Sequence, residues 1–415
     1  MIFSKLELKT LWPFYAQSLV QSMSKVIMPF YVLYFLSIGL NFFQIAMIGA
    51  VRSVISILFE IPTGAIADIY GRKISVIIGY LLMGISTVAV IFTKDFYLIL
   101  VIFGLNALFE TMVSGADSAW AVDLAEKHDN GLVDKYFLKR RVFKNIGMVV
   151  APLAAGLVVA QYNMSNLWII YGIGILVSVV FLLFGEGAPV LPEEDEDDEV
   201  LEANAFKNIF NQSDKTWQFI KKHSVLSLMF FAIFIFFIVE EITSLVWTPY
   251  LQNIGISLSQ IGYIFSAIAA LGVVTPLLVE KLLQYRSKYT VLITTTIIYG
   301  LALLLAAIFS KPLFVIILFM LTYNLEEVIE PLEEAITNSY IKSKVRATAL
   351  SLKSVIISLA SIVGGPIAGY LLGVISMQSA LLLSGFLFLA IPVIYIVARR
   401  KTNNLPKLRN EYTIR

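Results

Sequence analysis

Long apolar stretches constrain this chain more than any other feature. A membrane-spanning α-helix needs about 20 mostly apolar residues, and twelve segments meet that template: residues 11–36, 42–67, 74–93, 97–122, 142–161, 165–185, 225–250, 259–279, 289–309, 312–338, 349–374 and 377–398. The 415 residues are 58% hydrophobic and 14% charged, and the mean hydropathy is +0.83. Soluble domains are far more polar. We therefore predict an all-α membrane protein with twelve transmembrane helices.

The composition also excludes several classes of function. The chain has no cysteine, and its two histidines, His128 and His223, both lie beside charged residues outside the apolar stretches. Thiolate chemistry, disulfides and cysteine-ligated metals are therefore not available. We expect neither an enzyme nor a metal site. The net charge of +2 gives no reason to expect a nucleic-acid partner.

The positions of lysine and arginine predict the orientation, because cationic loops stay in the cytoplasm. With both termini inside, most of the 31 lysines and arginines fall in cytoplasmic segments, and the opposite loops hold only Lys94 and Lys311. We expect a multi-pass protein of the cell (plasma) membrane with both termini cytoplasmic.

An acidic run, PEEDEDDEV at residues 192–200, separates the sixth apolar stretch from the seventh and precedes an amphipathic segment. Like charges in a row are typical of a solvated linker. We predict an N-terminal six-helix bundle at residues 1–185, a cytoplasmic linker at 186–222, a C-terminal six-helix bundle at 223–398 and a basic cytoplasmic tail at 399–415.

The two halves resemble each other in sequence. YFLSIGLNFFQI, from Tyr34, matches YLQNIGISLSQI, from Tyr250, and the same offset of 216 aligns Leu108 with Asn324. An offset of 214 brings Pro152 onto Pro366. The repeats predict two pseudo-symmetric bundles, an architecture of secondary transporters whose substrate site lies near the bilayer midplane.

One segment carries a family resemblance. GAIADIYGRK resembles the signature loop of the major facilitator superfamily, with each residue of the pattern in place: Gly64, Asp68, Gly71, Arg72 and Lys73. Gly71 permits the turn between two helices, and the resemblance implies that Asp68 latches the cytoplasmic side during alternating access. We expect Asp123 to pair with Arg72. A helix-ending loop that only keeps positive charge inside is a compatible alternative.

A second segment, GMVVAPLAAG at residues 147–156, is similar to the antiporter motif of the twelve-helix drug/proton antiporter branch. Gly147, Pro152 and Gly156 are kept, and alanines stand at 151 and 155. The resemblance favours export over import. Ordinary small-residue helix packing is the alternative.

Charged residues fall in the helices that, by this resemblance, line the central cavity, namely the first, fourth, seventh and tenth. Each costs about 2.5–3.5 kcal/mol at the bilayer centre, and they are Lys25, Glu110, Asp117, Glu240, Glu241, Glu326, Glu327, Glu330, Glu333 and Glu334. A spacing of seven residues puts Glu110 with Asp117, and Glu326 with Glu333, on one helix face.

These charges predict the coupling site. Carboxylates in excess over cations at low dielectric favour protonation of some of them near neutral pH. We expect Glu110, Glu326 and Glu330 to exchange protons for substrate, with Asp117 and Glu333 nearer the cytoplasmic mouth. In the empty protein Lys25 would pair with Glu241 or with Glu110.

Other polar and aromatic positions leave alternatives open. Many family members carry an arginine in the fourth helix, where this chain has Glu110, so an arginine-assisted proton relay is not expected there. Arg52 could serve the cavity or a helix contact such as one with Glu60. Three aromatic residues could form a cage for a lipophilic cation: Tyr31, Trp247 and Tyr323.

The predicted function is proton-coupled export of small lipophilic or cationic compounds by alternating access. Proton-coupled import of a sugar, peptide or amine is an alternative, as is a non-transporting sensor or lipid-binding scaffold. The expected partners are a small-molecule substrate, protons and the lipid bilayer. We expect a monomer without cofactors, driven by the proton gradient.

Overall fold

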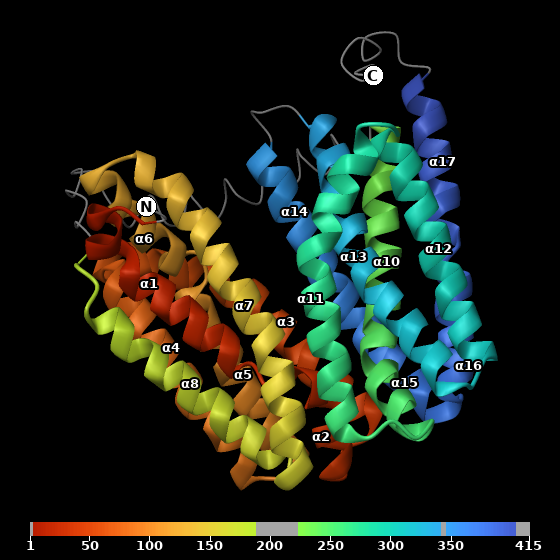
Figure 1. Ribbon diagram of the computed structural model, residues 1–415, viewed down its shortest axis with the longest axis horizontal. Helices are drawn as coiled ribbons and strands as arrows, with labels where there is room; N and C mark the ends of the chain where they lie inside the picture. The colour runs from red at the N-terminus through yellow and green to blue at the C-terminus, as the bar shows by residue number, and fades with distance from the viewer. Residues whose placement is uncertain (1–2, 188–222, 342–345, 404–415) are drawn as a thin grey trace. The chain divides into compact units, whose positions relative to one another are not determined.

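The computed structural model describes residues 3–187, 223–341 and 346–403. The regular structure of these residues is helical throughout (Figure 1), in the following order: α1 (Lys5–Ser24), η1 (Met28–Phe30), α2 (Tyr31–Ser37), α3 (Phe42–Tyr70), α4 (Arg72–Ala89), η2 (Val90–Phe92), α5 (Phe96–Val113), α6 (Ala116–His128), α7 (Gly131–Gln161), α8 (Ser165–Leu183), α10 (Ser224–Asn253), α11 (Leu258–Leu283), α12 (Lys288–Ile308), α13 (Pro312–Ser339), α14 (Arg346–Leu359), the π-helical turn η4 (Ala360–Gly364), α15 (Gly365–Val374), α16 (Met377–Phe388) and α17 (Ala390–Asn403).

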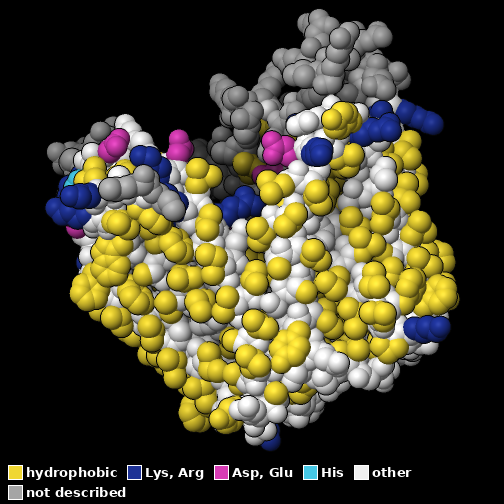
Figure 2. All heavy atoms as spheres, viewed as in Figure 1, with side chains coloured by type: hydrophobic (Ala, Val, Ile, Leu, Met, Phe, Trp, Pro, Cys, Tyr) yellow, Lys and Arg dark blue, Asp and Glu magenta, His cyan; other side chains and the backbone are white. Residues whose placement is uncertain are grey.

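Twelve helical stretches of the described chain are long and apolar enough to cross a membrane: Lys5–Ser37, Phe42–Tyr70, Arg72–Phe92, Phe96–His128, Gly131–Gln161, Ser165–Leu183, Ser224–Asn253, Leu258–Leu283, Lys288–Ile308, Pro312–Ser339, Leu352–Val374 and Met377–Thr402. Each overlaps one of the twelve predicted segments, and the all-α membrane fold is confirmed. Figure 2 shows hydrophobic side chains over the flanks of the helices and most of the visible charged side chains at one end of them.

The chain divides into two compact units. Unit 1 comprises Met1–Leu191 with Thr248–Ala270, and unit 2 comprises Pro192–Trp247 with Leu271–Arg415. The end of α10 and the first half of α11 thus belong to unit 1. Most of the predicted linker, 186–222, and of the predicted tail, 399–415, lies outside the described residues, and the domain boundaries predicted from sequence stay predictions.

Helix packing in unit 1 centres on α1 and α4. The helix α1 packs on α7 and α8, while α4 packs on α5 and α8. Between α1, α6 and α7 the core is aromatic, with Phe14, Trp120 and Tyr136 all at most 1% exposed. This burial fixes the helices that carry the polar residues of the unit.

In unit 2 the central helix is α12, which packs on α13, α16 and α17. A second cluster joins the start of α10 to α14 through Phe230, Ile233 and Ile356. The turn η4 interrupts the α-helical pattern of the eleventh span, and an added Cβ at Gly364 would lie 3.2 Å from Ile238 of α10. π-Helical turns of this kind occur often at functional sites.

Two spans of unit 1 that the sequence predicts as single helices are broken. The first breaks between α1 and α2 at Lys25, just before Pro29, which has no N–H to donate to a regular helix. The fourth breaks between α5 and α6 at Gly115, whose φ is +75°. A residue with a side chain would be strained there.

The signature segment is more helical than expected. The helix α3 continues through Tyr70, so Gly64 and Asp68 lie in its last turns rather than in a loop. Only Gly71, with φ +97°, separates α3 from α4. A positive φ at this residue agrees with the expected turn between the two helices.

Candidate functional site

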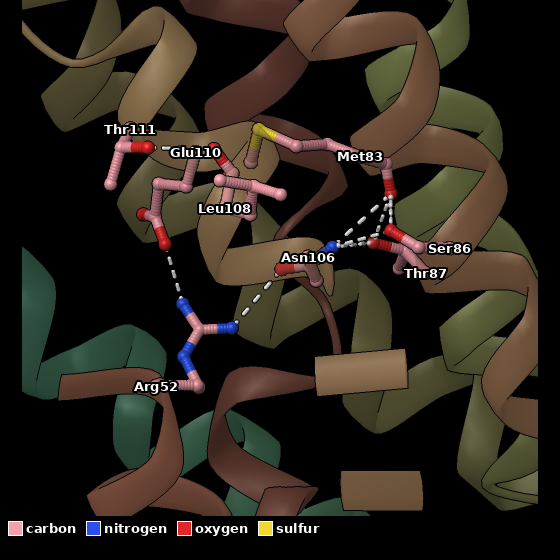
Figure 3. A network of polar contacts seen from close by, with 8 residues as sticks. All are labelled: Arg52, Met83, Ser86, Thr87, Asn106, Leu108, Glu110 and Thr111. Atoms are coloured by element: carbon pink, nitrogen blue, oxygen red, sulfur yellow. Dashed lines mark hydrogen bonds and ion pairs between the residues drawn. The ribbon is translucent and has the colours of Figure 1, made fainter. Parts of the chain in front are cut away.

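An ion pair joins α3 and α5 inside unit 1. Arg52 Nη2 lies 2.6 Å from Glu110 Oε2, and Arg52 Nη1 donates to Asn106 Oδ1 at 3.1 Å (Figure 3). Arg52 also lies over the ring of Phe103, 5.8 Å from its centroid. The guanidinium therefore binds Glu110, and not Glu60 as one sequence alternative had it.

The amide of Asn106 fixes this pair to the rest of the unit. Its Nδ2 donates to Ser86 Oγ at 2.9 Å and lies 3.2 Å from Thr87 Oγ1 and 3.3 Å from the carbonyl of Met83 (Figure 3). Asn106 is 8% exposed, so these bonds satisfy a buried amide. The Glu110 carboxylate is thus positioned through Arg52 by α4 and α5 together.

Lys25 lies at the break of the first span and is partly buried. The charges of Lys144, Arg52 and Glu110 act on its ammonium. Among the described residues of unit 1, however, no acceptor hydrogen-bonds or ion-pairs with it, because Glu110 is already bound to Arg52. The predicted Lys25–Glu110 pair is therefore wrong. The alternative pair with Glu241 would join the two units and stays a prediction.

Asp117 does not share a face with Glu110 on one helix, because the break at Gly115 puts the two on α5 and α6. Its carboxylate ion-pairs with Arg140 of α7 and accepts from Tyr80 at 3.2 Å. Asp117 is 5% exposed, and one of its oxygens has no hydrogen-bond partner among the described residues. It is buried, and its predicted place nearer the cytoplasmic mouth stays a prediction.

Three carboxyl groups of unit 2 interact electrostatically within the membrane spans. Glu326 and Glu330 lie one turn apart on α13, and Glu240 of α10 acts on both. Tyr299 of α12 donates to Glu326 Oε1 at 2.7 Å. Glu240 Oε2 is buried and has no hydrogen-bond partner among the described residues. A polar atom in that position is costly unless a proton or ligand satisfies it.

The sequence indicated Glu241 for this site, whereas the structure brings Glu240 to Glu326 and Glu330. Glu241 instead accepts a hydrogen bond from Ser361 of the π-helical turn. Adjacent residues of a helix point about 100° apart. In α10, where core residues occur on every side, sequence pattern could not distinguish the two glutamates.

Glu333 is also buried, and its predicted place nearer the cytoplasmic mouth stays a prediction too. It is 1% exposed and accepts a hydrogen bond from Tyr395 of α17. The next residue, Glu334, lies 4.0 Å from Lys353. Tyr395 is 62 positions from Glu333 in the sequence. No short-range sequence pattern identified Tyr395 as the hydrogen-bond partner of Glu333.

The signature segment forms contacts within unit 1. Arg72 binds both oxygens of Asp123, at 2.8 and 2.7 Å, and Asp68 at 3.1 Å. The predicted contact between Arg72 and Asp123 is present. Lys73 donates to the carbonyl of Gly185 at 2.6 Å, beyond the end of α8. These cations therefore tie α4 to α3, α6 and the end of α8, and a gating role for them stays a proposal.

The antiporter-like motif divides its contacts between two neighbours of α7. An added Cβ at Gly147 would lie 2.3 Å from Ser22 Cβ of α1, and one at Gly156 would lie 2.8 Å from the carbonyl of Ser259 of α11. An added Cβ at Gly262 would lie 2.6 Å from the carbonyl of Pro152. All three motif residues thus lie in close helix contacts, and at Gly147 and Gly156 these leave no room for a side chain.

The three aromatic candidates differ in their surroundings. Tyr31 packs against Phe35, Phe103 and Trp168 in unit 1. Trp247 is 1% exposed and lies against Phe319, so it is a core residue and not a cavity aromatic. Tyr323 also packs on Phe319 and lies close enough to Glu326 and Glu240 for their charges to act on it.

Comparison with known proteins agrees with this architecture. The chain is 24% identical over 409 residues to YxaM of Bacillus subtilis (strain 168), described as an uncharacterized MFS-type transporter; the match covers 94% of this chain and 97% of that protein.

Two solved structures share the fold at low sequence identity. The nucleoside transporter NupG has a TM-score of 0.76 and 13% identity, covering 96% of this chain and all of that one. A POT family transporter in complex with 5-aminolevulinic acid has a TM-score of 0.72 and 14% identity, covering 94% of this chain and 96% of that one. The family model of the major facilitator superfamily matches residues 14–324 and 229–412. The chain, with its twelve spans, belongs to the major facilitator superfamily of transporters.

Proposed function

We propose that this transporter exports small organic cations from the cytoplasm in exchange for protons, by alternating access in the cell membrane with both termini inside. The observation that carries the proposal is the group of three interacting carboxyls in unit 2, Glu240, Glu326 and Glu330. One oxygen of Glu240 is buried and has no hydrogen-bond partner in the described part of the chain.

Such a group suits proton exchange for a physical reason. Like charges at low dielectric repel each other, so a proton on one carboxyl relieves the repulsion among all three. A cation relieves the same repulsion. Proton and cation therefore compete for the group, and this competition is what an exchanger requires.

Tyr299 and Glu330 have different roles at this group of carboxyls. Tyr299 holds the Glu326 carboxyl in place through its hydroxyl. Glu330 is exposed, whereas Glu326 is partly buried. In this proposal Glu330 receives the cation first, and Glu326 and Glu240 hold the proton.

Import of a metabolite is the second candidate. The cations Lys25 and Lys144 in unit 1 favour it, since they suit a molecule with an anionic group. The solved relatives include a nucleoside transporter and a POT family transporter in complex with 5-aminolevulinic acid.

A growth assay tests the proposal. Cells that express the protein are challenged with ethidium (cationic), ciprofloxacin (zwitterionic), chloramphenicol (neutral) and fusidate (anionic). We expect protection against ethidium or ciprofloxacin that Glu240→Gln abolishes. Glu126→Gln, an exposed change on α6, should leave protection intact. Sensitisation by the protein would favour import, and protection limited to fusidate would contradict the acidic site.

A further inference from the structure

Unit 1 contains a second charged site, of the opposite sign. Around the break of the first span lie three cations, Lys25, Arg52 and Lys144, and one carboxylate, Glu110. Arg52 and Glu110 neutralise each other at 2.6 Å. Two positive charges remain, and Lys25 has no acceptor among the described residues of the unit.

Close packing holds Lys25 in this place. An added Cβ at Gly147 of α7 would lie 2.3 Å from Ser22 Cβ, and one at Gly174 of α8 would lie 2.0 Å from Ser24 Cβ. The two glycines thus let α7 and α8 approach the last turn of α1 directly before Lys25. The backbone then leaves the helix, with Lys25 at φ −68° and ψ 35°.

A lysine at such a break points to a ligand. A charge within the bilayer costs about 2.5–3.5 kcal/mol on insertion scales, and no ion pair among the described residues of unit 1 offsets that cost at Lys25. In secondary transporters, interrupted helices of this kind form ion and substrate sites. The Arg52–Glu110 pair cannot release its carboxylate to Lys25 without leaving Arg52 unpaired in its turn.

We propose that the helix break at Lys25 binds an anionic group, a carboxylate or phosphate, of the transported molecule, with Lys25 as the direct contact and Lys144 adding positive potential. The inference rests on the proposed transport function and narrows its substrates. It narrows them to molecules that carry an anionic group complementary to the cations of unit 1.

The absence of cysteine from the chain allows a direct test. Met28 is 49% exposed, and its N–H donates to the carbonyl of Lys25 at 3.3 Å. A Met28→Cys variant in phosphatidylcholine nanodiscs is labelled with anionic sulfonatoethyl methanethiosulfonate or cationic trimethylammonioethyl methanethiosulfonate. Relative to a free thiol in solution, we expect the anionic reagent to be favoured by about tenfold.

Variants of Lys25 identify the source of that preference. Adding Lys25→Gln should remove most of it, and Lys25→Arg should retain it. Lys94→Gln, an exposed change in the same unit, controls for net charge and should have no effect. A preference equal to that of the free thiol, or one that Lys25→Gln leaves unchanged, would overturn the proposal.

Protection of the same thiol tests binding. Three probes differ by single charged groups: 3-phenylpropionate, phenylalanine and 2-phenylethylamine. Only the two with a carboxylate should slow labelling, and Lys25→Gln should weaken their protection by about tenfold or more. If phosphatidylglycerol in the nanodisc slows labelling and none of the three probes does, the site binds a lipid headgroup. That result would refute a substrate site.

Neither labelling measurement needs a proton gradient or net transport. If export fails in the growth assay, the labelling results still decide whether the anionic site exists. If labelling shows no anionic site, proton-coupled export of simple cations remains open to its own test.

Discussion

Arg52 of α3 and Glu110 of α5 form an ion pair of 2.6 Å, although 58 positions separate them in the sequence. Their side chains are 32% and 49% exposed, so the pair is only partly shielded by the protein. A double-mutant cycle with Arg52→Gln and Glu110→Gln should give a coupling energy of about 0.2–1 kcal/mol. Unfolding in mixed detergent micelles measures it. A coupling energy of zero would mean that the pair does not position Glu110.

The two acidic partners of Arg72 should differ in their effect on stability. Asp123 binds the guanidinium with both oxygens and is 26% exposed, whereas Asp68 is 65% exposed. We expect Asp123→Asn to lower the free energy of unfolding by about 1–3 kcal/mol and Asp68→Asn by less than about 1 kcal/mol. If Asp68→Asn reduces transport but not the free energy of unfolding, the role of Asp68 lies in gating.

Glycines of the two family motifs should respond differently to alanine. At Gly147 the new methyl group would overlap Ser22 Cβ at 2.3 Å, and overpacking of this kind costs about 1–3 kcal/mol. At Gly64 no atom lies within 4 Å, so Gly64→Ala should be tolerated. Thermal unfolding of the purified variants compares them. Equal melting temperatures would contradict the close α1–α7 contact.

Tyr395 is the hydrogen-bond donor to the buried carboxyl of Glu333. Tyr395→Phe would leave that carboxyl without its donor in a site 1% exposed, which costs about 1–3 kcal/mol. The matched control is Tyr285→Phe, because Tyr285 is 76% exposed. Unfolding of both variants in micelles tests this, and equal stabilities would show that the bond contributes nothing.

The twelve spans could be predicted from the sequence because a bilayer imposes a minimum length on every apolar helix. The pair of Arg72 with Asp123 could also be predicted, since the sequence places both near the predicted cytoplasmic ends of their helices. The break at Gly115 had a signal in the Ser-Gly dipeptide of VSGAD, and the break at Lys25 had one in the nearby Pro29. Each of these segments was long enough to be predicted as one continuous helix, so neither break was predicted.

The partners of the buried charges could not be predicted. Arg52 had acidic candidates at several positions, and only the packing of α3 on α5 selects Glu110. Whether Glu240 or Glu241 meets Glu326 depends on the rotation of α10 about its axis. That rotation is fixed by tertiary contacts such as the one between Ile238 and Gly364.

The most direct test of the account is proton movement in proteoliposomes that contain a pH-sensitive dye. When ethidium or ciprofloxacin is moved by the wild-type protein, the lumen pH should change in the direction of exchange, and Glu240→Gln and Glu326→Gln should each abolish the change while Glu126→Gln preserves it. Substrate-driven proton flux of undiminished size in both carboxyl variants would contradict the central claim.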